Sequence, residues 1–211
     1  MTKLFFDIET IPCAQDKKAD LEEVTRKKFK MSDDDDDWHH KTGLEGTLGR
    51  ICCIAYIKEE NGRVTRDVLS GDEKDMLTKF WQVAAGVQQF IGHNIWGFDL
   101  PFIYQRSIIL KVKTRTDISF ARYRNTPIYD TMCEWALWDF SELKRHKLDT
   151  LAKVMGLPTS KDLMDGSEVW QYFQDGKIKE ICDYCLKDVV LVRQVYQRMT
   201  FEDQKTEDLP F

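Results

Sequence analysis

The sequence predicts an α/β fold: a mixed five-stranded sheet, three antiparallel strands followed by parallel ones, flanked by helices. Three apolar, β-rich runs come first, at residues 3–10, 51–58 and 64–69. Asn61-Gly62 between the last two is a hairpin turn, so these strands should form an antiparallel meander. Two shorter apolar runs, 89–92 and 127–129, then alternate with helical patterns, an order typical of parallel strands joined through helices.

Apolar residues at helical spacing predict the helices. A helix capped by Asp72 should reach about residue 85. Its apolar face carries Met76, Leu77, Phe80 and Trp81. The next helix is expected to begin with Asp99 as its cap and Pro101 in its first turn, and to end near residue 109. Further helices are expected at residues 131–138, 148–155, 167–175 and 178–199.

The length of 211 residues and the absence of a repeat or Pro/Ser-rich linker predict a single domain over residues 1–211. With 31 Lys plus Arg against 36 Asp plus Glu, the net charge of −5 argues against nucleic-acid binding through bulk positive charge. No secretion signal and no run of about 20 apolar residues is apparent, so we expect a cytoplasmic protein without a membrane partner. Its six cysteines should then be reduced thiols.

Residues 14–47 interrupt the regular pattern and are highly charged. They include a candidate short helix at 17–30, a run of five acids at 33–37, and the pair His39-His40. Charge blocks of this kind are usually solvated, so we expect a flexible surface insertion. The alternatives are a lid or metal-collecting segment, because the insertion leaves the strand that carries Asp7, and, more weakly, zinc binding by the two histidines.

Two acids close the first strand. Side chains in a strand alternate between faces, so Asp7 and Glu9 should point the same way. Carboxylates this close repel each other, and their burial without a partner is costly. A divalent cation removes both problems, and a set of oxygen ligands suits Mg²⁺ or Mn²⁺. The alternative is a surface Asp-x-Glu that happens to follow an apolar strand.

Two further acids stand at positions suited to join them. Asp99 lies where a strand gives way to a helix, at the carboxyl end of the sheet, where α/β sites usually lie. Asp188 follows Tyr184 by four residues and shares its helix face, which is otherwise apolar and should point to the core. A helix cap would also explain Asp99. A salt bridge at the edge of the apolar stripe would explain Asp188, with Tyr184 as ordinary packing.

Together the three segments resemble the DEDD superfamily of 3′–5′ exonucleases. Asp7-Ile8-Glu9 resembles the first motif, residues 94–99 the second (Asn-x-x-x-Phe-Asp), and residues 184–188 the third, in the Tyr-x-x-x-Asp form of the tyrosine subclass. The likeness is strongest to proofreading domains of family B DNA polymerases and to stand-alone polymerase-B-like predicted exonucleases. It spans nearly the whole chain, including residues 147–199 with Asp165-Gly166-Ser167, but not the 14–47 insertion, and it implies a ribonuclease H-like fold.

The resemblance also implies an activity: metal-dependent 3′–5′ hydrolysis of single-stranded DNA to nucleoside 5′-monophosphates, with two Mg²⁺ or Mn²⁺ ions. It implies that Asp7 bridges both ions and that Glu9 and Asp188 hold the ion that activates water. Asp99 would support the second ion, partly through water. Tyr184 would orient the attacking water rather than act as a strong base, since an ordinary phenol titrates near ~10.

Residues beside the motifs are expected to hold the substrate. By the resemblance, Thr10 and Ile11 contact the terminal nucleotide, while Asn94 and Phe98 meet its sugar and base. The expected partner is therefore a single-stranded nucleic acid, DNA in preference to RNA.

Several residues outside the motifs allow more than one interpretation. Two groups of cations, Lys111, Lys113 and Arg115 and the run at residues 144–147, either follow the strand backbone or form a solubilising surface. Asp130 and Asp149 are expected to support or cap neighbouring elements rather than bind metal. Two other functions fit the same residues: an RNase D-like 3′–5′ exoribonuclease, and a non-catalytic nucleic-acid-binding module on the same fold. The second would be expected to lack one of the four acids, and all four are present.

Overall fold

The computed structural model describes residues 1–32, 34–114, 118–139, 141, 144–159 and 164–202. Its centre is a five-stranded sheet in the order β3-β2-β1-β4-β5. The strands are β1 (Lys3–Ile11), β2 (Arg50–Glu60), β3 (Arg63–Ser70), β4 (Gln89–Gly92) and β5 (Ile128–Asp130). The first three are antiparallel, while β4 runs parallel to β1 and β5 parallel to β4. This is the predicted mixed sheet of a ribonuclease H-like exonuclease fold.

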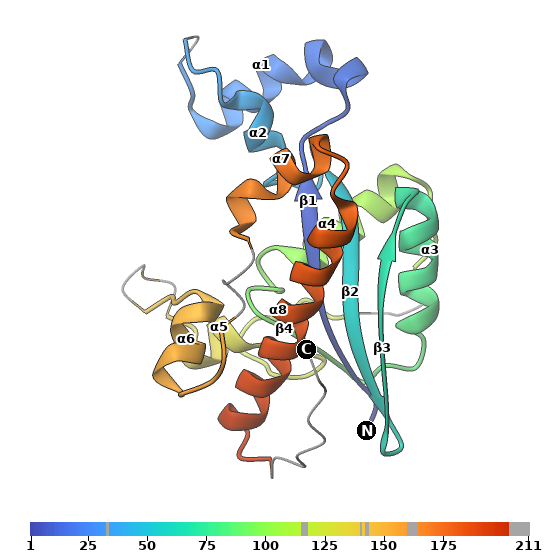
Figure 1. Cartoon of the computed structure of the whole chain (residues 1–211), viewed down its shortest axis with the longest axis vertical. Coiled ribbons are helices and arrows are strands. Elements are labelled where there is room, and N and C mark those ends of the chain that lie inside the picture. The colour runs from blue at the N-terminus through green and yellow to red at the C-terminus, as the bar shows by residue number, and fades with distance from the viewer. Residues whose placement is uncertain (33, 115–117, 140, 142–143, 160–163, 203–211) are drawn as a thin grey trace.

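Alternating side chains of β1 build a core on each face of the sheet. Leu4, Phe6 and Ile8 belong to the core on one face, which α3 (Glu73–Val83) and α4 (Asp99–Ile109) cover. Phe5 belongs to the core on the other face, which α8 (Ile178–Met199) covers. Helix α8 crosses in front of the sheet in Figure 1. The odd-numbered positions of β1 therefore face α8.

The shorter helices lie around the ends of the sheet (Figure 1). They are α1 (Lys18–Phe29), α2 (Trp38–Thr42), α5 (Thr131–Trp135), α6 (Leu148–Val154) and α7 (Val169–Gln174), with 3-10 turns at Gln15–Lys17 and Gly166–Glu168. Helix α8 has the predicted bounds, whereas α5 ends three residues early. Leu137 and Trp138 take φ values of 50° and 59°, which no α-helix accommodates. No helix within the described ranges has the length and apolar character needed to cross a bilayer.

Residues 14–47 contain the expected helix near 17–30, observed as α1, and the shorter α2. Hydrogen bonds join α2 to the chain at the end of β1 and just after it. The Cys13 N–H donates to Thr42 Oγ1 over 2.8 Å, and His39 Nε2 lies 3.0 Å from the Cys13 carbonyl oxygen. The Thr10 hydroxyl donates to the Gly43 carbonyl over 2.7 Å. These bonds hold the α2 end of the segment beyond the end of β1, where Figure 1 shows it.

Candidate active site

Asp7 and Glu9 lie on the part of β1 that extends past β4. Strand β4 pairs only with Lys3–Phe5, so residues 7–9 are bonded to β2 alone among the strands. Both acids occupy odd positions and face α8, as the alternation predicts. They keep partial exposure, whereas their neighbours Phe6 and Ile8 are buried. The two carboxylates are thus placed side by side on a rigid strand, at an opening in the sheet.

Asp99 reaches this opening from α4. The Ile8 N–H donates to Asp99 Oδ1 over 3.1 Å, in a position beyond the end of the β4 ladder. Asp99 is buried, and a buried backbone N–H needs an acceptor. The expectation that Asp99 caps the helix is wrong: Phe98 occupies the N-cap position, and Asp99 is the first helical residue. The Asp99 side chain accepts the Ile8 N–H because β4 pairs with β1 only as far as Phe5 and offers Ile8 no acceptor.

Asp130 holds the segment that leads to Asp99. Its two carboxylate oxygens accept the N–H groups of Asn94 and Trp96, each over 2.9 Å. The same side chain caps α5 by accepting from Met132 and Cys133. Asp130 is fully buried, so it is the supporting residue that the sequence suggested, with a larger set of contacts than a cap. It fixes a turn in which Asn94 has a φ of 64°.

Close packing at the end of β4 also requires a glycine. A Cβ added to Gly92 would lie 1.9 Å from Ile95 Cγ2, so no larger residue fits without moving the turn. This contact seats residues 92–95 against β1.

Helix α8 brings Tyr184, Cys185 and Asp188 to the same opening. Tyr184 is hydrogen-bonded to Asp188. The Cys185 thiol lies 3.5 Å from Asp7 Oδ2 and 3.4 Å from the Asp7 carbonyl oxygen. Ligand atoms of Asp7, Glu9 and Cys185 all lie within 4.8 Å of one another. The sequence identifies Cys185 only as one of six reduced thiols, because its proximity to Asp7 depends on how α8 docks.

The charges at this site repel one another. Burial, followed by the charges of Asp99 and Asp188, holds the pKa of Asp7 well above its ordinary value. Burial and the neighbouring Asp7 do the same to the pKa of Glu9. Burial raises the pKa of Asp99 to about 7, although the Ile8 hydrogen bond lowers it. Four carboxylates therefore interact in one place. Their oxygen-rich donor set fits a hard divalent cation, which would compensate the buried charge.

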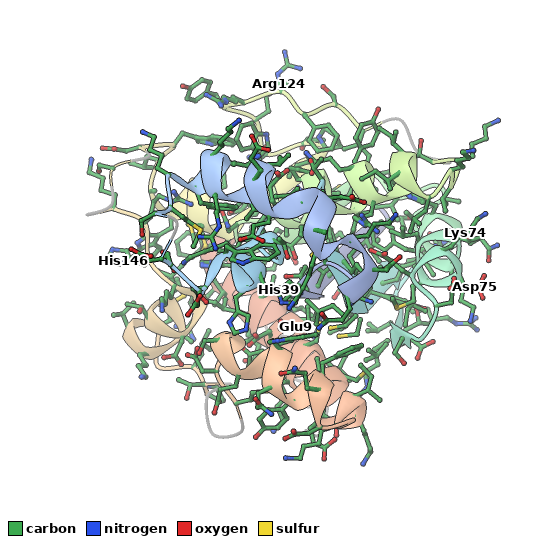
Figure 2. All side chains as sticks on the ribbon, turned by 90° about the horizontal axis from the view of Figure 1, so that it is seen from above. Glu9, His39, Lys74, Asp75, Arg124 and His146 are labelled. Carbon is green, nitrogen blue, oxygen red and sulfur yellow. The ribbon has the colours of Figure 1, made fainter. Side chains whose placement is uncertain are left out.

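A cleft of about 300 Å³ opens beside Glu9 and Thr10. One wall comes from Pro12 and the 14–47 segment, and the other from the 3-10 turn before α7 and the first turn of α7. The residues lining these walls are Pro12, Asp37, His40, Lys41, Gly43, Leu44, Gly166, Ser167 and Trp170. In the view from above, Glu9 lies near the middle of the molecule, under the ribbon of the 14–47 segment (Figure 2). The cleft gives access to the acids from the end of the sheet.

A sequence profile described as "predicted 3′–5′ exonuclease related to the exonuclease domain of PolB" matches residues 44–208. The chain belongs to this family of predicted exonucleases. The match includes Asp99, Tyr184 and Asp188, whereas β1 with Asp7 and Glu9 precedes it. A comparison with curated proteins gave no match. The structure thus adds the first two acids to an exonuclease domain whose other motif residues lie in the matched part.

The four predicted substrate-binding residues differ in their surroundings. Thr10 lines the cleft, and its hydroxyl is bonded to Gly43. Asn94 Oδ1 accepts from Arg145 Nη2 over 3.3 Å at an exposed position. Phe98 is half-buried, with its ring centroid 5.5 Å from that of Phe102. Ile11 is buried in the core under α8, so the structure does not bring its side chain to the cleft.

The cleft-lining residues of the insertion were missed as site residues. A charged segment without periodicity indicates exposure but not which distant residues it meets. His39 is buried against Trp170, with ring centroids 5.8 Å apart. Within the described ranges, Asp7, Glu9 and Cys185 form the one cluster with metal-ligand proximity, and His39 and His40 are outside it. The only available hint was the likeness of Asp165-Gly166-Ser167 to the exonuclease family, since two of these residues line the cleft.

Proposed function

We propose that this exonuclease removes nucleotides from the 3′ end of single-stranded DNA and releases nucleoside 5′-monophosphates. Asp7, Glu9, Asp99 and Asp188 would hold two Mg²⁺ or Mn²⁺ ions, which supply an activated water and stabilise charge on the leaving oxygen. The observation that carries the proposal is the mutual repulsion of four carboxylates from β1, α4 and α8 beside an open cleft. Such a cluster has little structural value without cations.

Each protein group has a separate task in this proposal. The charges of Asp99 and Asp188 both raise the pKa of Asp7. Asp7 therefore interacts with both of these acids, which suits a ligand that bridges two ions. Glu9 faces the cleft and lies where the scissile phosphate would enter. Asp99, held by the Ile8 N–H, has limited freedom to move and suits the supporting position. The lining cations Lys41 and, when protonated, His40 would face the phosphate backbone.

Tyr184 is suited to orient water rather than to remove a proton from it. Burial and the adjacent Asp188 raise the pKa of its phenol above the ordinary value, so it keeps its proton at neutral pH. A protonated phenol can donate to one oxygen and accept from another, and so fix a water near Asp188. A Tyr four residues before the last acid is the arrangement of the tyrosine subclass, to which we assign the protein.

A 5′-labelled oligonucleotide tests the proposal directly. With Mg²⁺ or Mn²⁺, the wild-type protein should shorten it from the 3′ end, whereas Asp188→Asn and chelator-treated protein should not. Tyr184→Phe should be slower by about 10²-fold, the lower range for a positioned catalytic group. Asp183→Asn is the matched control, because Asp183 is exposed on the same helix and pairs with the exposed Lys179 over 3.9 Å. Unchanged activity of Asp188→Asn would refute the assignment.

The polymer is tested with matched DNA and RNA strands of one sequence. Preference for the DNA strand is the expected result. Faster cleavage of RNA would favour the RNase D-like alternative. Binding of either strand without cleavage, under every divalent cation tried, would favour a non-catalytic module.

A further inference from the structure

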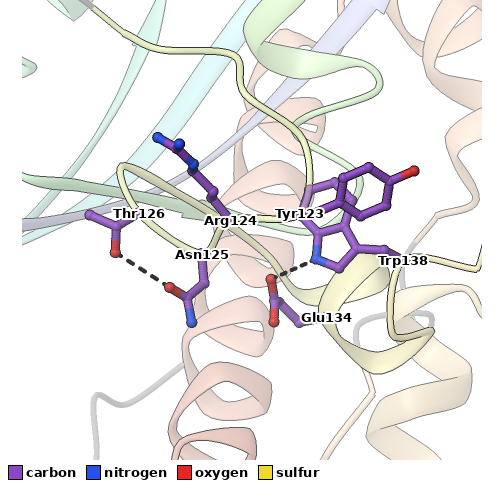
Figure 3. A pocket seen from close by; sticks show the side chains of 6 residues that line it. All are labelled: Tyr123, Arg124, Asn125, Thr126, Glu134 and Trp138. Atoms are coloured by element: carbon purple, nitrogen blue, oxygen red, sulfur yellow. Dashed lines mark hydrogen bonds between the residues drawn. The ribbon is translucent and has the colours of Figure 1, made fainter.

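An aromatic, arginine-rich surface lies outside β5, next to the proposed active site. It comprises Trp96, Arg122, Tyr123, Arg124 and Trp138, which we call the Tyr123 surface. A hollow of about 490 Å³ opens on it, lined by Tyr123, Arg124, Asn125, Thr126, Glu134 and Trp138 (Figure 3). None of these residues belongs to the three acidic motifs except Trp96, within the second.

The rings of this surface form a row. The centroids of Tyr123 and Trp138 are 5.5 Å apart, and those of Trp138 and Trp96 are 6.1 Å apart. Tyr123 leaves 68% of its surface exposed. A large aromatic residue with this exposure contributes little to the core, whereas Trp138 and Trp96 are partly buried and support it from below. An exposed ring beside further aromatic side chains is typical of an interaction site.

The backbone that presents these rings is strained. Tyr123 and Trp138 have φ values of 61° and 59°, a region that bulky side chains rarely adopt. Leu137, with a φ of 50°, is 86% exposed. Strain of this kind persists where function requires a side chain in a set position. Here the strained residues hold the Tyr123 and Trp138 rings together at the surface.

Positive charge surrounds the rings, although the whole chain carries −5. The Arg122 guanidinium lies 4.7 Å from the Trp96 ring centroid. Arg124 is exposed at the hollow, and Arg145 is bonded to Asn94 at its inner side. The acid of the hollow, Glu134, accepts the indole N–H of Trp138 over 3.0 Å and so also orients that ring (Figure 3).

The surface is continuous with the proposed catalytic site. Trp96 belongs to the turn held by Asp130, and the same turn leads into Asp99. From this turn the rings lead away from the acids toward the rim, where Figure 2 shows Arg124, while Glu9 lies near the middle of the same view. A chain with its 3′ end at the acids could therefore continue along the rings.

We propose that the Tyr123 surface binds nucleotides upstream of the 3′ end of a single-stranded polynucleotide, with bases on the rings and phosphates beside the arginines. The inference rests on the proposed exonuclease function. Alternating aromatic and cationic groups bind single strands without sequence preference, because every base has a face that can stack. A paired duplex would keep its bases from the rings. The surface therefore selects a single strand and adds affinity that grows with strand length.

Binding to labelled oligo-dT of 3 to 15 nucleotides, in chelator so that no hydrolysis occurs, tests the proposal. Wild-type affinity should rise with length. Tyr123→Ala should lose affinity for the longest strand by about tenfold, while Tyr123→Phe should keep it, because the ring is retained. Phe201→Ala is the control, since Phe201 is 92% exposed near the end of α8. An oligo-U series repeats the measurement for RNA.

Cleavage kinetics separate this proposal from the proposed function. Tyr123→Ala should raise KM for long strands and leave kcat and trinucleotide cleavage unchanged. If the wild-type protein cleaves and Tyr123→Ala binds long strands as tightly as the wild type, the proposed role of the Tyr123 surface is wrong. The proposed exonuclease function would then stand. Equal losses for the shortest and longest strands also overturn the role of the surface, since the Tyr123 ring would then act on the nucleotides at the acids and not on those upstream. Length-dependent binding by a protein that cleaves nothing supports the surface and overturns the nuclease.

Discussion

The acids of the site and the walls of the cleft beside Glu9 are built differently. The acids stand on β1, on the first residue of α4 and on the 22-residue α8, which pack into the core of the protein. The cleft walls include the five-residue α2 and the 3-10 turn before α7, and their side chains are partly solvated. In the proposed function, the groups that react with the substrate are therefore fixed by elements of the core, whereas the groups that hold it stand on short elements at the surface. Substitutions at the acids should have larger effects than substitutions in the cleft walls.

The largest effect is expected at Asp7. Asp7→Asn should lower kcat by about 10³-fold, because a bridging metal ligand contributes several kcal/mol to transition-state stabilisation. The same change should raise the melting temperature of the metal-free protein, since it removes a charge that raises the pKa of Glu9. Asp75→Asn, an exposed acid on α3, is the control. A variant that is both inactive and less stable would assign Asp7 a structural role instead.

The buried acids of the site should also make the stability of the metal-free protein depend on pH. The pKa of Asp99 is raised to about 7 by burial, so the folded state binds a proton that the unfolded state releases near ~4. Protonated Asp99 therefore makes its whole contribution to the free energy of unfolding below pH ~4, and this contribution is lost as the pH rises through ~7. Between pH 5 and pH 8 the loss should be about 3 kcal/mol in urea unfolding. Asp99→Asn should flatten this profile, and a profile that instead rises over this range would contradict it.

Asp130 holds the turn before Asp99 but is not one of the four proposed metal ligands. Asp130→Ala leaves the N–H groups of Asn94 and Trp96 without their acceptor and should cost about 2 kcal/mol of unfolding free energy. It should also lower kcat at temperatures where the variant is folded, because the turn before Asp99 loosens. Asp149→Ala removes another buried acid, on α6, and should leave kcat unchanged. Equal kcat in the two variants would show that the turn does not depend on Asp130.

The smallest effect is expected on the insertion wall. Lys41 lines the cleft and pairs with Asp37 at 3.5 Å. Lys41→Ala should raise KM about threefold to tenfold with kcat unchanged, as expected for a partly exposed phosphate contact. Lys27→Ala, on the outer part of α1, is the matched control. A fall in kcat without a change in KM would show that Lys41 acts in the chemical step and not in binding. The contrast between the acids and the cleft walls would then be wrong.

Much of the frame could be predicted from the sequence because local patterns determine it. Helix α8 repeats apolar residues at helical spacing over its whole length, and its predicted and observed bounds agree. The Asn61-Gly62 turn fixes the β2–β3 hairpin, and alternation along β1 places Asp7 and Glu9 on the face of α8. These signals lie within a few residues of the structure they specify.

Contacts between distant segments could not be predicted in the same way. Asp99 looks like a helix cap in its own sequence, and only the early end of β4 explains why it bonds to Ile8. Likewise, the proximity of Cys185 to Asp7 follows from helix docking. The early end of α5 follows from positive φ values at residues that are not glycine, for which the sequence has no signal.

The central position of β1 has a practical consequence. This strand joins β2 on one side to β4 on the other, yet it precedes the part of the chain that matches the exonuclease family. A truncated protein that began at the matched region would leave a hairpin and a pair of short parallel strands with no bonded neighbour between them. We therefore expect the first dozen residues to be needed both for assembly of the sheet and for the proposed chemistry, and a boundary placed at the start of the matched region would remove them.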